Sequence, residues 1–188
     1  MAAQTIKTWT RSEYERLVEL GMLTPDDRAE LVDGLIVKKM THNPPHFTAL
    51  GLAEDWLRSI VGPRRHVRAQ GPIALSDMSE PEPDLVVVAG SRGHYASRHP
   101  KPEEVELLVE ISHSSIDRDR RLKAPLYARA GVRELWIVDL DNRRLELHRE
   151  PGPGGYRNVT TLAEDDSATP LFAPSEHVKV ANLIPTSN

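Results

Sequence analysis

Two acidic residues lie at the ends of apolar segments, where a carboxylate is least expected. Asp84 comes immediately before the apolar run Leu85–Ala89, and Glu110 lies near the end of the apolar run 107–111. A carboxylate in a buried strand is costly unless it is paired or binds an ion. Carboxylate oxygens are the ligands that Mg²⁺ and Mn²⁺ prefer. We therefore predict that Asp84 and Glu110 meet at neighbouring strand ends and hold one divalent cation.

Lys123 is the third candidate, in a segment with helical spacing over residues 116–130. A lysine beside a metal can orient an attacking water or stabilise the negative charge that develops on a phosphate. Pro125 has no N–H and is best tolerated in a first helical turn. We therefore expect the regular helix to begin near Leu122, which places Lys123 close to a helix N-terminus, where phosphate is attracted.

Each of these residues also has an ordinary explanation. Asp84 can be a turn acid that accepts hydrogen bonds from nearby backbone N–H groups. Glu110 can belong to a structural ion pair, with Lys123 itself as the partner. Lys123 alone would be a solvated helix residue. Only the three residues together favour a site.

The elements that must position these residues follow from apolar periodicity and turn residues. Buried strands alternating with helices predict an α/β fold in a single domain over residues 1–188, with a core of about 10–150 and a C-terminal β extension over 151–188. Thr10 and Glu13 form a capping-box pattern before a short helix, and Asp33-Gly34 is a strong hairpin signal. Further helices are expected over 46–61 and 116–130, the latter capped by Ser115. Strands are expected over 66–75, with a break at Gly71-Pro72 as an alternative, and over 85–89, 106–111, 134–139, 145–148, 156–162 and 177–180.

Composition limits the class of protein. The chain has 188 residues, 39% hydrophobic and 28% charged, as in ordinary soluble globular proteins. The absence of cysteine excludes disulfides, thiolate zinc sites and a cysteine nucleophile. No apolar run approaches the roughly 20 residues of a membrane helix, and the first residues lack the apolar stretch of a signal peptide, so a cytoplasmic protein without a membrane partner is expected. The net charge of −4 argues against bulk electrostatic DNA binding but allows a local basic patch.

The order of several short motifs adds a resemblance to these observations. The motifs are Glu30-Leu31-Val32-Asp33-Gly34, His46, Pro83-Asp84, Val109-Glu110-Ile111-Ser112, Asp119, Lys123, Tyr127, Gly131-Val132 and the run 134–139. Together they resemble the Uma-type restriction endonuclease family of the PD-(D/E)XK nuclease superfamily. The resemblance implies a restriction-endonuclease-like mixed central sheet flanked by helices, with extra β-hairpins. It also implies a hydrolase, a Mg²⁺- (or Mn²⁺-) dependent endodeoxyribonuclease that cleaves the phosphodiester bonds of DNA.

The resemblance assigns further roles. The two metal-binding acids fall on Asp84 and Glu110, and the main-chain carbonyl of Ile111 is a further metal ligand. In the wider superfamily the catalytic lysine lies two residues after the glutamate, where this chain has Ser112, whereas the Uma-type family places it on the helix, at Lys123.

Two accessory residues belong to the opening segment of the family pattern. Glu30 would be an accessory acid and His46 a phosphate contact. Their ordinary explanations are a surface charge at a strand edge and a residue at the start of a helix.

A basic run accompanies Lys123. Arg118, Arg120 and Arg121 are either a patch that contacts phosphate or a solvated charged helix face. A homodimer is also expected, because related nucleases often pair to cut two strands. An exposed strand at 145–148 or the first helix would supply its surface.

Two other classes of function stay open. The first is a non-catalytic nucleic-acid-binding or protein-binding module on a nuclease fold, which the acidic net charge and the displaced lysine favour. The second is a two-carboxylate glycosidase, which the low aromatic content of 5% disfavours because sugar sites use aromatic platforms. Magnesium binding separates the first of these from an active nuclease.

Overall fold

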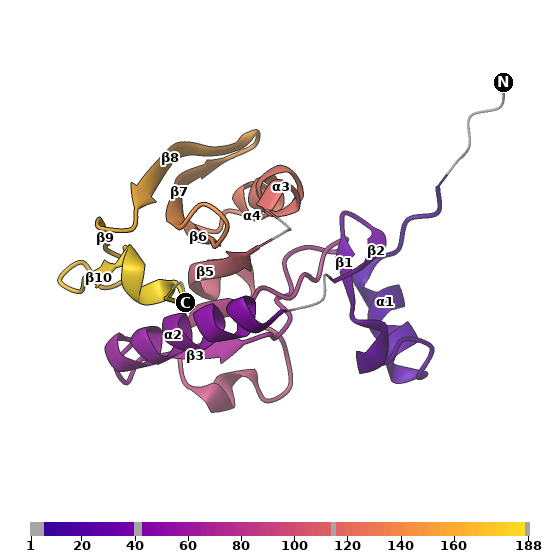
Figure 1. Cartoon of the computed structure of the whole chain (residues 1–188). Coiled ribbons are helices and arrows are strands. Elements are labelled where there is room, and N and C mark those ends of the chain that lie inside the picture. Colours follow the sequence, from indigo (N-terminus) through magenta and orange to yellow (C-terminus); the bar gives the residue numbers. More distant parts are fainter. Residues whose placement is uncertain (1–5, 40–42, 114–115, 187–188) are drawn as a thin grey trace, which may run out of the picture.

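A six-stranded mixed sheet forms the centre of the molecule (Figure 1). The computed structural model describes residues 6–39, 43–113 and 116–186. The strands stand in sequence order, with β5 and β6 parallel and every other neighbouring pair antiparallel. They are β3 (Arg65–Ala69), β4 (Leu85–Ala89), β5 (Val105–Ser112), β6 (Glu134–Asp139), β7 (Arg144–Gly152) and β8 (Gly155–Ala163).

Helical segments cover both faces of this sheet, which explains its continuous apolar runs. Leu85 and Val87 of β4 pack in the same core as residues of helix α2 (Pro44–Ile60). The alternate residues Val86 and Val88 pack in a second core, together with residues of α4. The expected strands 85–89 and 134–139 are confirmed at both ends.

The segment that carries Lys123 is helical in three parts: α3 (Ile116–Arg118), the π-helical turn η4 (Asp119–Lys123) and α4 (Ala124–Arg129). Regular α-helix begins at Ala124, close to the start expected near residue 122, but it continues a helical run and is not preceded by a free end. In the π-helical turn, the N–H of Ala124 donates to the carbonyl of Asp119. Pro125 follows directly, so its missing N–H falls at the position where the backbone hydrogen bonds change from the π-helical to the α-helical pattern. Lys123 therefore lies at the junction of the π-helical turn and α4, inside a longer helical run. The cap expected at Ser115 lies outside the described residues.

The N-terminal elements lie at one end of the sheet, beside the body of the molecule (Figure 1). They are α1 (Arg11–Glu19), the 3₁₀ turn η1 (Pro25–Asp27), β1 (Ala29–Val32) and β2 (Leu35–Lys38). The capping box of Thr10 and Glu13 is confirmed. The predicted hairpin is confirmed too, with positive φ at Asp33 (47°) and Gly34 (78°), as a tight hairpin turn requires.

One expectation about strands is narrowed and one is wrong. The strand expected over 66–75 follows the alternative with a break near Gly71-Pro72: it ends at Ala69, because Gln70 turns the chain with a φ of 50° and Gly71-Pro72 follows. Residues 145–148 are not an exposed strand: they lie within β7, which pairs with β6 on one side and β8 on the other, and are buried. That stretch therefore offers no free edge to a second copy of the chain.

Short elements complete the chain. The 3₁₀ turns η2 (Arg92–Tyr95) and η3 (Pro102–Glu104) lie in the connection between β4 and β5. The last elements are β9 (Ser167–Ala168), β10 (Val178–Lys179) and η5 (Val180–Leu183), which pack in the same core as α2. Within the described ranges, no helix has the length and apolar character needed to span a membrane.

Candidate active site

Asp84 and Glu110 lie across from each other at the ends of two neighbouring strands. Strands β4 and β5 are antiparallel with Leu85 opposite Val109, so the register continued by one residue places Asp84 opposite Glu110. Both side chains are buried, 6% and 3% exposed. The structure thus brings together the two acids that the sequence singled out.

Two donors among the described residues, both from other elements, hold the carboxylate of Asp84. Its Oδ2 accepts the backbone N–H of Ile111 at 2.8 Å and lies 3.1 Å from Nε2 of His46. Burial favours the protonated form, but the hydrogen bond and charge of His46 and the charge of Lys123 lower the pKa of Asp84 below its ordinary value. The explanation as a local turn acid does not hold, because these donors come from β5 and α2.

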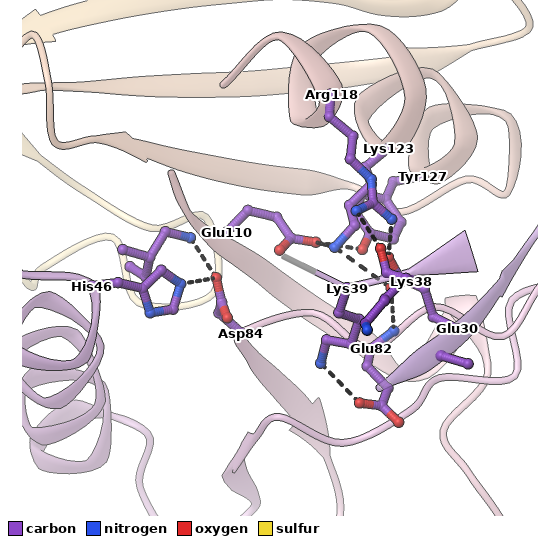
Figure 2. A network of polar contacts seen from close by, with 12 residues as sticks. Glu30, Lys38, Lys39, His46, Glu82, Asp84, Glu110, Arg118, Lys123 and Tyr127 are labelled. Carbon is purple, nitrogen blue, oxygen red and sulfur yellow. Dashed lines mark hydrogen bonds and ion pairs between the residues drawn. The ribbon is translucent and has the colours of Figure 1, made fainter. Parts of the chain in front are cut away.

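Glu110 is bonded through one oxygen (Figure 2). Its Oε1 accepts from Nζ of Lys123 at 3.1 Å and from the hydroxyl of Tyr127 at 2.6 Å. Among the described residues none donates a hydrogen bond to Oε2. The pKa of Glu110 is raised to about 8: burial is the largest cause, the charge of Lys123 opposes it, and the charges of Asp119 and Asp84 add to it.

Lys123 is a buried cation between two acids, not a solvated helix residue. It is 6% exposed, and its Nζ lies 3.1 Å from Oε1 of Glu110 and 3.6 Å from Oε2 of Glu30. Burial lowers the pKa of Lys123, but the charges of Glu110 and Glu30 outweigh it and raise the pKa above the usual lysine value. The ion pair with Glu110 that the sequence allowed is present, so Lys123 is held as an ammonium ion.

Tyr127 joins this group although the sequence assigned it no role in the site. It is fully buried, and its hydroxyl donates to the same oxygen of Glu110 as Lys123 does. The available signal was spacing: residues four apart share a helix face, so a tyrosine at 127 reaches the partner of a lysine at 123.

Glu30 and Arg118 form the outer part of the same network. Glu30 on β1 is 1% exposed and accepts from Arg118 at 2.8 Å and from the backbone N–H of Glu82 at 3.1 Å. Arg118 also donates to the carbonyl of Lys38. The strand-edge surface charge expected as an alternative for Glu30 is therefore wrong, and Figure 2 shows Glu30 below Lys123.

His46 lies at the start of α2, where Asn43 caps the helix. The side chain is buried, 6% exposed, and contacts Asp84 from the side opposite Glu110 (Figure 2). Both accessory residues thus lie within the network of the two acids.

The three arginines of the basic run do not form one patch. Arg118 binds Glu30, whereas Arg120 binds Asp139 and Glu146 elsewhere on the sheet. The side chain of Arg121 is 82% exposed and lies 3.9 Å from Asp117.

Ser112, at the usual superfamily lysine position, is fully buried on β5. The nearest cation to Glu110 therefore comes from the helical segment.

A divalent cation fits the two acids. Oε2 of Glu110 has no donor from the described chain, and the charge of Asp84 raises the pKa of Glu110, a repulsion that a cation would relieve. Across residues 6–39, 43–113 and 116–186, no cluster of three or more His, Cys, Asp or Glu side chains has the arrangement of a metal site. Two carboxylates suit Mg²⁺, which keeps several waters and takes substrate phosphate as a ligand.

Comparisons with known proteins identify the family and the fold. Residues 11–180 match the Uma2 family, which is described as "Putative restriction endonuclease". No curated protein matches the chain. A solved structure, a "putative nuclease belonging to DUF820" from Anabaena variabilis ATCC 29413, superposes with a TM-score of 0.71 over 93% of this chain and 96% of that one. At 17% identity this likeness shows the shared fold. With 170 residues (11 to 180) of its 188 matched, the chain belongs to the Uma2 family of restriction-endonuclease-like proteins.

Proposed function

We propose that the protein is a Mg²⁺-dependent endonuclease that hydrolyses phosphodiester bonds of DNA. The observation that carries the proposal is the meeting of Asp84 and Glu110 at neighbouring strand ends, where Oε2 of Glu110 accepts no hydrogen bond from residues 6–39, 43–113 or 116–186. A buried acid with one unengaged oxygen beside a second acid suits a hard cation. Mn²⁺, which has the same ligand preference, is expected to substitute.

The two acids would hold the cation, and its remaining coordination positions would be available to water and to the substrate phosphate. Asp84 and Glu110 would supply carboxylate oxygens, and Ile111 its main-chain carbonyl. When bound, Mg²⁺ supplies a Lewis acid for the phosphate and makes a bound water easier to deprotonate. The N–H of Ile111 and the ring of His46 fix the orientation of Asp84, as supporting residues around metal ligands do.

Lys123 would act through its charge. Its pKa is raised by Glu110 and Glu30, so it stays protonated and is unsuited to take a proton from water. A buried ammonium ion close to the acids can donate to the attacking water and stabilise negative charge on the phosphate. The accessory acid Glu30 would hold that ammonium ion in place, since its Oε2 lies 3.6 Å from Nζ.

A second candidate is a non-catalytic nucleic-acid-binding or protein-binding module. One observation favours it: each acid already has a basic partner, His46 for Asp84 and Lys123 for Glu110. Calorimetric titration with Mg²⁺ separates the two candidates. A cation that binds, and no longer binds to Glu110→Gln, supports the nuclease, whereas absence of binding supports the module.

The direct test is cleavage. Supercoiled, linear and single-stranded DNA are incubated with purified protein and Mg²⁺ or Mn²⁺, beside Asp84→Ala and a control, Asp117→Ala. Asp117 is a matched acid because its side chain is 76% exposed and outside the candidate site. Wild type and the control should cleave and Asp84→Ala should not. Equal background cleavage by all three proteins under every condition would sink the catalytic proposal.

DNA would be the partner of this site, and a homodimer remains part of the proposal. Its surface would have to include α1 or another exposed element, because 145–148 is internal to the sheet. Sedimentation velocity of the purified chain measures the oligomeric state.

A further inference from the structure

A hollow of about 560 Å³ lies between the N-terminal elements and the start of α2. This volume is within the usual range for pockets that bind small organic groups, about 300–1,000 Å³. Its wall includes residues from α1, the end of β2, α2 and the segment before β4, among them Tyr14, Val18, Lys39, Phe47 and Glu82. Of these residues, Glu82 alone takes part in the site described above, through its backbone N–H, and no side chain of the five has a role there.

Residues that line the hollow adjoin residues of the candidate site. Glu82 lines the hollow and lies two residues before Asp84, and its backbone N–H donates to Glu30 at 3.1 Å. Phe47 lines the hollow and directly follows His46, whose ring contacts Asp84. Figure 2 shows Glu82 in the same network as Glu30. A group bound in the hollow would therefore lie beside a phosphate bound at the two acids.

The wall combines an apolar side with a charged side. Phe47 is 56% exposed and Val18 48% exposed, so both offer apolar surface to a ligand. Tyr14 is 7% exposed, and its hydroxyl is fixed by a 2.9 Å hydrogen bond to the carbonyl of Ala29, so its ring is a rigid part of the wall.

On the charged side, Lys39 and Glu82 form an ion pair of 2.8 Å, and Gln70 lines the hollow next to them. A flat group with a π face and hydrogen-bonding edges, which is the chemistry of a nucleobase, fits such a wall. Aromatic side chains commonly stack such bases in single-strand binding sites.

We propose that this hollow binds an unpaired base of the nucleic-acid strand whose phosphodiester lies at Asp84 and Glu110. The position of the phosphate rests on the proposed function. A base that is stacked and paired inside a duplex cannot enter a pocket unless it is extruded, at the cost of its stacking and pairing. The substrate class is therefore single-stranded DNA, or DNA with unpaired bases next to the bond that is cut.

Binding without metal tests this proposal independently of cleavage. Fluorescence anisotropy in EDTA measures the affinity for a labelled single-stranded DNA oligonucleotide and for the same sequence as a duplex. Phe47→Ala should weaken single-strand binding about tenfold, the effect of losing one stacked base, and Phe47→Trp should retain it. Leu52→Ala is the matched control, since Leu52 lies on the same helix, is 38% exposed and does not line the hollow. Circular dichroism confirms that each variant is folded.

Equal affinity for single strand and duplex, or no loss with Phe47→Ala, would overturn the proposal. The cleavage assay separates this failure from failure of the proposed function. If single-strand binding depends on Phe47 but the protein cleaves no DNA, the proposed base site is supported and the proposed endonuclease activity is contradicted. If single strands are cleaved with metal and Phe47→Ala has the same KM as wild type, the endonuclease activity is supported and the proposed base site is contradicted.

Discussion

Two clusters of buried charge meet the helical segment 116–129, and they are built differently. The first is the candidate site, in which Lys123 and Arg118 face Asp84, Glu110 and Glu30. The second, which we call the Arg120 cluster, consists of Arg120, Asp139, Arg144, Glu146 and His148. Three carboxylates face two permanent cations in the candidate site, whereas two carboxylates face two permanent cations in the Arg120 cluster. With Glu110 ionised, above its pKa of about 8, the candidate site therefore has an excess of negative charge that the Arg120 cluster lacks.

The carboxylate oxygens show the same difference. In the Arg120 cluster both oxygens of Glu146 accept from Arg120, and Oε2 also lies 3.1 Å from His148. Burial raises the pKa of Glu146, but the hydrogen bonds from His148 and Arg120 outweigh it and bring the pKa to about 2. Glu110 has donors on one oxygen and a pKa of about 8. A carboxylate whose two oxygens both accept hydrogen bonds, which we call saturated, is suited to holding strands together. A carboxylate with donors on one oxygen can still bind a ligand through the other.

The largest expected effect is on stability, and it should separate the clusters. Asp139→Asn is expected to lower the free energy of unfolding by about 3 kcal/mol, since it leaves the partners of a buried carboxylate uncompensated. Asp139 is fully buried and accepts from Arg120, Arg144 and Asn142. The isosteric Glu110→Gln should cost less than about 1 kcal/mol, because the amide oxygen still accepts from Tyr127.

Urea denaturation of the two variants beside wild type makes this measurement. Equal losses in the two variants would mean that the candidate site is as structural as the Arg120 cluster. The proposed difference between the two clusters would then be contradicted, and the non-catalytic module would be favoured.

Metal affinity should change in the opposite order. Glu110→Gln is expected to weaken Mg²⁺ binding by about 100-fold or more, since it removes a proposed ligand. Glu146→Gln should leave the affinity within about twofold, because its carboxylate is already saturated. Isothermal titration calorimetry with Mg²⁺ measures both variants. A loss with Glu146→Gln as large as with Glu110→Gln would show that binding depends on overall charge and not on the candidate site.

The sequence predicted the acids of the candidate site better than their neighbours. Asp84 and Glu110 are visible because a carboxylate beside an apolar strand is costly and therefore rare. Both strands were expected close to their observed bounds, since sheets covered on two faces have continuous apolar runs.

What the sequence could not predict depends on contacts between distant segments. Glu30 and His46 look like surface residues along the chain, and only the packing of β1 and α2 buries them against the candidate site. The π-helical turn was missed because Pro125 reads as a helix start by local rules. Residues 145–148 alternate like an exposed strand, yet β8 covers their second edge. Such effects come from tertiary structure, which local patterns do not contain.

The pH dependence of Mg²⁺ binding should follow Glu110. Its pKa of about 8 in the metal-free protein means that the carboxyl carries a proton at pH 6 to 7, which the cation must displace. The affinity should rise about tenfold per pH unit below pH 8 and level off above it. Calorimetry at pH 6, 7 and 8, in buffers of different ionisation enthalpy, measures both the affinity and the proton released. A flat profile without proton release would contradict the assignment of Glu110 as a ligand.

Stability should depend on pH with opposite signs in the two clusters. The raised pKa of Glu110 gives a contribution that is complete below 4.5, its ordinary value, and is lost as pH rises through about 8. The lowered pKa of Glu146 gives a contribution that is present above 4.5 and is lost as pH falls through about 2. Measuring the free energy of unfolding of wild type, Glu110→Gln and Glu146→Gln across pH assigns each part of the pH dependence to one residue. If both residues change stability with the same sign as pH rises, the proposed difference between the clusters is contradicted.

The smallest expected effect concerns the two buried tyrosines, one beside each cluster. Tyr127→Phe removes the 2.6 Å hydrogen bond to Glu110, and Mg²⁺ affinity should fall about tenfold, as for other residues that orient metal ligands. Tyr156→Phe is the matched control, because Tyr156 packs on His148 and donates to the carbonyl of Val132 at 2.9 Å. It should lower stability by about 1 kcal/mol and leave Mg²⁺ binding unchanged. If Tyr127→Phe lowers stability alone, with Mg²⁺ affinity intact, its hydroxyl serves the core and Lys123 is sufficient to orient Glu110.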